Sequence, residues 1–276
     1  MSQQKTIVVT GCSSGIGAHC ARALKQDGWR VFATARRPDD LEALQADGLE
    51  AFYMDYREPD SIAALAEGVL ERTGGSLDAL YNNGAYSQAG AVEDLSTEAL
   101  REQFEANFFG WHELTRRIIP VMRARGHGRI VQCSSILGLV PMRWRGAYNA
   151  SKFALEALSV TMRMELAETD IHVSLIEPGP IESKIAVNAL HHIERNIDIE
   201  NSVHRKDYER ELRRMRQGGV RSKHKLGPEA VYEALKHALE SKKPKTHYVL
   251  TRPAKIATTL KRLLPAELLY RLLEKR

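Results

Sequence analysis

The chain has 276 residues, of which 43% are hydrophobic and 27% are charged. These values are ordinary for a globular protein with a substantial core and argue against wholesale disorder. No run of 18 apolar residues occurs and the N-terminus lacks the apolar stretch of a signal peptide, so we expect neither a spanning helix nor a leader. Three cysteines are too few for a disulfide framework. We predict a cytoplasmic protein with one domain over residues 1–276.

The net charge of +5 is concentrated in one segment. Residues 203–225 contain nine Lys or Arg and three Asp or Glu, an excess of six positive charges. Such a segment can bind nucleic acid, acidic lipid or an anionic substrate, but a solvated helix face is the commoner explanation. No nucleic-acid motif accompanies the basic residues, so we predict that nucleic acid is not a partner.

Short β-branched runs alternate along the chain with longer helical patterns. Most runs are almost continuously apolar, as expected of strands buried on both faces of a parallel sheet. The alternation predicts repeated βαβ units and therefore an α/β fold, with a doubly wound, mostly parallel seven-stranded sheet and helices on both faces. The predicted strands cover residues 6–9, 30–34, 51–54, 78–82, 129–134, 172–177 and 247–250.

A glycine-rich motif follows the first predicted strand. The sequence TGCSSGIG, residues 10–17, lies between that strand and a helical pattern. Its glycines allow a tight turn, close approach to a pyrophosphate and close packing of helix on strand, while the helix N-terminus supplies N–H donors. We therefore predict a dinucleotide site whose contacts include Gly11, Ser13, Ser14, Gly15, Ile16 and Gly17.

The spacing TGxxxGxG resembles that of the short-chain dehydrogenase/reductase family, and other motifs of this family follow in order. The resemblance implies a Rossmann fold in which Asp55 of MDYRE contacts the adenine. It also implies that NNGA, with the last two residues of the usual NNAG exchanged, lies on the adenosine side and that PGPIES lies beside the nicotinamide. The residues implied in these two segments are Asn83, Gly84, Pro178, Gly179, Ile181 and Ser183.

Tyr148 and Lys152 lie four residues apart in GAYNASKF, on one face of a predicted helix. A positive charge about 5 Å from the phenol, at an effective dielectric of about 20, favours phenolate by roughly 3 kcal/mol. This predicts a pKa of Tyr148 lowered by about two units. The resemblance implies that Tyr148 donates a proton and Lys152 holds the nicotinamide ribose. It further implies that Ser135, rather than Ser134, binds the substrate oxygen and that Asn107 holds a water linking Lys152 to solvent.

The end of the second predicted strand, FATARRPDD, bears on the choice of cofactor. An NAD enzyme normally places Asp or Glu about 20 residues beyond the glycine motif. Ala35 occupies that position, and Arg36 and Arg37 follow. Because guanidinium suits a 2′-phosphate, we predict NADP(H) over NAD(H). The alternative is that both arginines are exposed loop charges. The resemblance places a second marker of NADP enzymes, a basic residue, just before the second glycine of the motif, and this chain has Ser14 there instead.

More than forty residues separate the PGP motif from Gly227, longer than an ordinary connection. The resemblance identifies residues of about 183–226 as the segment that covers the substrate, which we call the lid. The chain looks most like the branch of the family that contains hydroxysteroid dehydrogenases, retinol dehydrogenases and bacterial aldehyde reductases. This resemblance implies that the substrate is a lipophilic alcohol, aldehyde or ketone. The basic residues of the lid would instead suit an anionic or carrier-bound ketoacyl substrate. A non-catalytic nicotinamide-sensing module is the remaining alternative, and the complete catalytic set argues against it.

The C-terminal residues of about 254–275 predict two amphipathic helices, the second starting near Pro265. Their leucines form one stripe, and the lysines and arginines lie off it. This amphipathic pattern favours burial of the leucines, against the domain or against a sister subunit in a homodimer or homotetramer, over peripheral membrane contact. The histidines show no metal-ligand spacing, so we predict no metal site. The stripe consists of Leu260, Leu263, Leu264, Leu268, Leu269, Leu272 and Leu273.

Overall fold

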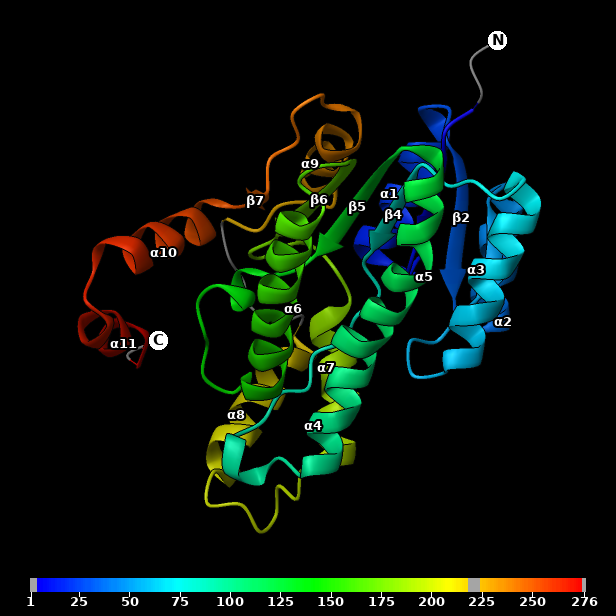
Figure 1. Cartoon of the computed structure of the whole chain (residues 1–276). Helices are drawn as coiled ribbons and strands as arrows, with labels where there is room; N and C mark the ends of the chain where they lie inside the picture. The colour runs from blue at the N-terminus through cyan, green and yellow to red at the C-terminus, as the bar shows by residue number, and fades with distance from the viewer. Residues whose placement is uncertain (1–3, 218–223, 275–276) are drawn as a thin grey trace.

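A seven-stranded parallel sheet forms the centre of the protein (Figure 1). The computed structural model describes residues 4–217 and 224–274. The strand order is β3-β2-β1-β4-β5-β6-β7, so the direction of winding reverses between β1 and β4 and confirms the predicted doubly wound α/β sheet. The strands are β1 (Thr6–Val9), β2 (Arg30–Ala35), β3 (Glu50–Tyr53), β4 (Ala79–Asn82), β5 (His127–Cys133), β6 (Asp170–Glu177) and β7 (His247–Val249).

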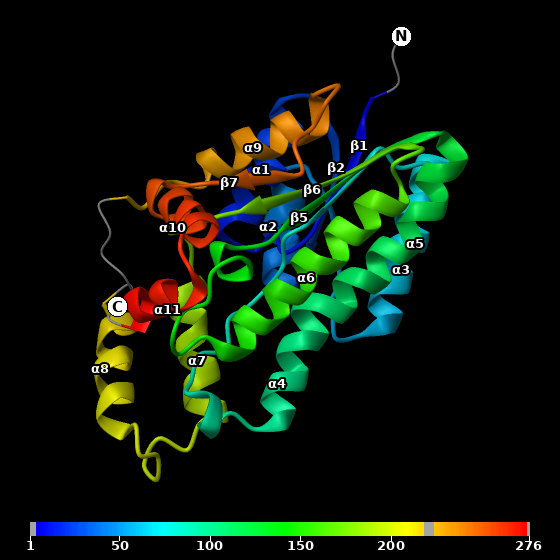
Figure 2. The same ribbon diagram turned by 60° about the vertical axis from the view of Figure 1, so that its left-hand side comes forward.

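Helices cover both faces of this sheet (Figure 2). One face carries α1 (Gly15–Gln26), α2 (Pro38–Ala46) and α9 (Glu229–Glu240), and the other carries α3 (Pro59–Thr73), α5 (Gly110–Arg125) and α6 (Gly146–Glu165). The central strands β1 and β4 are buried along their whole length, which is why their sequences are mostly apolar. Helix α4 (Thr97–Phe104) joins α5 through one π-helical turn, η2 (Glu105–Phe109).

The predicted lid contains two helices, α7 (Ile185–Asn196) and α8 (Arg205–Arg216). They share a small apolar core to which α7 contributes Ile193 and α8 contributes Tyr208. A backbone bridge between Ile181 and Leu226 ties the two ends of the lid together. Residues 218–223 of the predicted lid, with two of its basic residues, lie outside the described part of the chain.

The C-terminal tail forms two helices, α10 (Arg252–Leu263) and α11 (Ala266–Glu274), with Pro265 between them as predicted. The domain covers only part of their leucine stripe. Leu269 is buried, whereas Leu263, at 74% exposed, Leu268 and Leu272 face solvent. The prediction of burial against the chain's own domain is therefore wrong for three of the seven leucines, because helical periodicity indicates which side is apolar but not what packs on it. None of the described helices has the length and apolar character required to span a membrane.

Candidate active site

A cavity of about 460 Å³ lies at the carboxyl ends of the strands, on both sides of the switch between β1 and β4. Ligands of open α/β sheets bind at this position. Asn107, Gly17 and Arg37 are not among the lining residues. All the other predicted site residues line it, namely Gly11, Ser13, Ser14, Gly15, Ile16, Arg36, Asp55, Asn83, Gly84, Ser135, Tyr148, Lys152, Pro178, Gly179, Ile181 and Ser183.

The glycine-rich turn between β1 and α1 lines part of this cavity. Gly11 and Gly15 have positive φ angles of 67° and 57°, which favour glycine. Gly17 serves packing, because a Cβ there would lie 2.3 Å from the carbonyl oxygen of Gly11. Ser14 caps α1 without a side-chain hydrogen bond. The first N–H groups of α1 are therefore available to a phosphate group.

Arg36 and Asp55 lie together at the β2–β3 end of the cavity. The Asp55 carboxylate accepts hydrogen bonds from Arg57, at 2.7 Å from Nη2, and lies 3.4 Å from Nη1 of Arg36. Burial opposes ionisation, but the bonds from Arg57 prevail and lower the pKa of Asp55. Arg37 points elsewhere and pairs with Asp39. The sequence offered two candidate arginines, and the structure brings one of them to the cavity.

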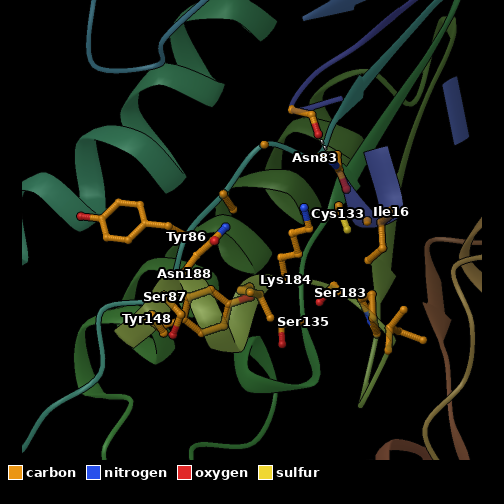
Figure 3. A pocket seen from close by; sticks show the side chains of 18 of the residues that line it. Ile16, Asn83, Tyr86, Ser87, Cys133, Ser135, Tyr148, Ser183, Lys184 and Asn188 are labelled. Atoms are coloured by element: carbon orange, nitrogen blue, oxygen red, sulfur yellow. Dashed lines mark hydrogen bonds between the residues drawn. The ribbon is translucent and has the colours of Figure 1, made fainter. Parts of the chain in front are cut away.

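Ser135, Tyr148 and Lys152 meet at the centre of the cavity; Figure 3 shows the first two. Tyr148 and Lys152 lie one turn apart on α6, and Ser135 begins the turn after β5. All three side chains are buried. Lys152 Nζ donates a hydrogen bond of 2.8 Å to the carbonyl of Cys133 and lies 4.2 Å from the ring centroid of Trp111. The predicted catalytic lysine is thus fixed by the end of β5.

The prediction of a lowered pKa for Tyr148 is wrong for this structure. Burial raises the pKa of the phenol above its ordinary value, and the opposing effects of the Ser135 hydroxyl and the Arg145 charge are smaller. The prediction used the charge of Lys152 alone and omitted the cost of removing a phenolate from water. At neutral pH the phenol is protonated, which is the form that can donate a proton to a developing alkoxide.

Asn107 lies in the π-helical turn η2 and is fully buried. Its amide donates to the carbonyl of Tyr86 at 2.9 Å and accepts from the N–H of the same residue at 3.2 Å. These bonds hold the loop after β4 against the π-helical turn between α4 and α5. Its role in holding a water beside Lys152 stays a prediction.

Sequence reasoning missed the lining residues that belong to no motif. Met142 and Arg145 precede the catalytic helix, and Asn188 and Arg214 come from the lid helices. Figure 3 shows Asn188 with Ser135 and Tyr148 in the same pocket. The one signal for this group was the excess of basic residues in the lid, which does not by itself say which of them face inward.

A buried acidic pair lies between α6 and the end of β6. The carboxylates of Glu156 and Glu177 and the ring of His247 have ligand atoms within 4.8 Å of one another. His247 Nδ1 is already bonded to Glu177 at 2.5 Å, so we assign the group as an ion pair. Burial, with the nearby charge of Glu177, raises the pKa of Glu156 to about 7. The prediction that the protein holds no metal is not tested by this arrangement.

An α/β sheet that presents a phosphate-binding turn beside a buried phenol and lysine defines the class of nicotinamide-dependent oxidoreductases. Within that class, the model of the short chain dehydrogenase family matches residues 5–194. The chain belongs to this family, as the resemblance implied.

Three known proteins show the extent of the similarity. The uncharacterized oxidoreductase YbbO of Escherichia coli is 39% identical over 271 residues, which cover 98% of this chain and 94% of that protein. The NADPH-dependent 1-acyldihydroxyacetone phosphate reductase of Schizosaccharomyces pombe is 35% identical over 206 residues, 74% of this chain and 69% of its own. The crystal structure of a short-chain dehydrogenase from Streptomyces avermitilis, 31% identical, superimposes with a TM-score of 0.79 over 95% of this chain and 93% of that one.

Proposed function

We propose that the protein is an NADP(H)-dependent oxidoreductase that transfers hydride between nicotinamide and a lipophilic alcohol, aldehyde or ketone. The observation that carries this proposal is one cavity with the protonated Tyr148 at its centre and Arg36 at the β2–β3 end. Arg36, 62% exposed, is free to turn toward a 2′-phosphate, and Ala35 offers no carboxylate to a ribose 2′-hydroxyl. The fission yeast relative is named as NADPH-dependent.

Each residue of the cavity has one chemical task in this proposal. The bound cofactor supplies the hydride. Ser135 holds the carbonyl oxygen, and Tyr148 gives its proton to the same oxygen as negative charge develops there. Lys152 holds the ribose hydroxyls and places a positive charge beside the phenol. Apolar side chains, including Leu137 and Met142, exclude water from the reacting carbonyl.

The direct test is a spectrophotometric comparison of NADPH and NADH with decanal and 2-decanone. We expect oxidation of NADPH that depends on the carbonyl compound, and a much higher Michaelis constant for NADH. Binding of NADPH without oxidation by any aldehyde or ketone would instead favour the nicotinamide-sensing module.

The affinity for NADPH is expected to fall as the pH rises through about 8. Burial lowers the pKa of Lys152 to about 8, with Glu156 partly opposing this effect. Lysine carries its charge below its pKa and loses it above, so the ammonium that holds the ribose is lost on the alkaline side. Fluorescence titration of NADPH across this range gives the measurement, with Lys152→Met as the control that should remove the dependence. An affinity of the unmodified protein that stays constant through pH 8 would contradict the assigned role of the ammonium.

We also propose that the exposed leucines of α10 and α11, Leu263, Leu268 and Leu272, are covered by a second copy of the chain. Short-chain dehydrogenases often form oligomers, and full burial of a leucine contributes about 1.5–3 kcal/mol. The two glutamates of α11, Glu267 and Glu274, offer partners to Lys255 and Lys261 of α10 in a second copy, although α11 also carries Arg271. Salt-screened attraction to anionic lipid is the competing explanation.

We expect the protein to work in the cytoplasm.

Leu263→Glu is therefore expected to lower the molecular mass in solution, measured by light scattering, because it places a charge in the apolar contact. Ala266→Glu, an exposed position next to the stripe, is the matched control and should leave the mass unchanged. The intact protein should not sediment with anionic vesicles. Salt-sensitive sedimentation, with a mass that neither variant alters, would show that lipid rather than a second copy covers the stripe.

A further inference from the structure

The lid end of the cavity is basic. Besides Arg36 and Lys152, four cationic side chains line the cavity, and three of them belong to the lid. Asp55, at the β2–β3 end, is the one carboxylate among the described lining residues. We call the four residues the lid cations: Arg145, Lys184, Arg214 and Lys225.

Two of the lid cations share a single carboxylate. Glu211 Oε1 accepts a hydrogen bond of 3.0 Å from Arg145 Nη2 and one of 2.6 Å from Arg214 Nη2. Lys184 and Lys225 form no ion pair with any residue in the described ranges 4–217 and 224–274. Four positive charges and one negative charge leave an excess of three positive charges among these side chains. The side chain of Arg145 is 15% exposed, so its charge is poorly compensated by water.

Other basic residues of the lid behave as an ordinary solvated helix face. Arg210 pairs with Asp207 one turn away on α8, and Arg216 pairs with Glu194 of α7. Neither lines the cavity. The two explanations left open by the sequence therefore apply to different residues of the same helix, since Arg214 lines the cavity with a side chain that is 47% exposed, whereas Arg210 is 73% exposed and does not line it.

We propose that the lid cations bind an anionic group carried by the substrate. This inference rests on the proposed function and makes the substrate amphipathic, with a reacting carbonyl, an apolar chain and a phosphate or carboxylate. Guanidinium groups bind such oxyanions through paired, charge-assisted hydrogen bonds. Apolar side chains at the same end, Met142 and Ile185, suit the chain. Arg145 lies three residues before Tyr148, which fixes the distance from the anion to the reacting carbonyl.

The experiment compares two ketones that differ in one group, 1-palmitoyl-dihydroxyacetone phosphate and 1-palmitoyl-dihydroxyacetone, with the full-length protein and NADPH. Arg214→Ala should raise the KM of the phosphate ketone about ten- to a hundredfold more than that of the uncharged ketone, the effect of losing one charge-assisted contact. Arg214→Lys should recover part of the loss. Arg210→Ala, which removes an exposed arginine of the same helix, should change neither constant.

An equal rise in KM for both ketones would overturn the proposal and make the Arg145–Glu211–Arg214 contacts a structural link between α6 and α8. Calorimetry with dodecyl phosphate, dodecanoate and dodecanol in the presence of NADP⁺ tests the site without turnover. Tighter binding of either anion than of the alcohol, weakened by Arg214→Ala, supports the anion site and tells phosphate from carboxylate. Equal binding of all three refutes it. Arginine-dependent anion binding without reduction of any ketone would refute the proposed function and leave the anion site standing.

Discussion

Replacing Tyr148 with Phe is expected to lower kcat at least about a hundredfold, the lower end of what a general acid contributes. The change removes one hydroxyl and retains the ring, which lies 5.8 Å from Lys152 Nζ. The lysine is held by the Cys133 carbonyl and not by the phenol, so it should keep its position and the affinity for NADPH should barely change.

Steady-state kinetics with decanal and fluorescence titration of NADPH measure the two quantities. Tyr270→Phe removes an exposed phenol of α11 and serves as the control, with both quantities retained. The mechanism fails if the Tyr148 variant turns over normally while binding the cofactor as before. A loss of NADPH affinity equal to the loss of turnover would indicate damage to the cavity instead.

Replacing Arg36 with Ala is expected to weaken NADPH binding by about ten- to a hundredfold and to change NADH binding much less. The reason is geometric, because Arg36 borders the cavity beside Asp55 and only NADPH carries a 2′-phosphate for the guanidinium to bind. Arg37→Ala is the matched control, because this neighbouring arginine is 72% exposed and pairs with Asp39. Dissociation constants of both cofactors for both variants complete the comparison.

Equal losses for NADPH and NADH in the Arg36 variant would mean that this residue does not select the cofactor. A selective loss in the Arg37 variant would transfer the role to the neighbouring residue and show that the loop rearranges when the cofactor binds.

The sheet and the glycine-rich turn were predictable because they depend on local sequence. Continuous apolar runs indicate strands buried on both faces, and the prediction of 247–250 for the last strand, found at His247–Val249, is off by one residue. The turn from Thr10 to Gly17 needs glycine at set positions, and a Cβ at Gly11 would lie 2.4 Å from the Cα of Gly84. A constraint of this kind is visible in the sequence even though its partner is seventy-three residues away.

The electrostatics of the site were not predictable from spacing. The interval from Tyr148 to Lys152 places both on one helix face but says nothing about the depth of burial, and burial decides the direction in which the pKa of Tyr148 moves. The same limit applies to Arg36 and Arg37, which are adjacent in sequence and point to different surroundings. The direction of a side chain depends on packing between elements that are distant in sequence.

The bridge between Ile181 and Leu226 joins the two ends of the lid. The core that α7 and α8 share also includes Ala89 from the segment after β4, so we expect the two lid helices and this segment to exchange their amide hydrogens as one group. The Tyr208 hydroxyl accepts a hydrogen bond from the N–H of Ala91 and donates one to Asp94, so the free energy that holds α8 in place is shared with the segment after β4 and is not a property of the lid alone.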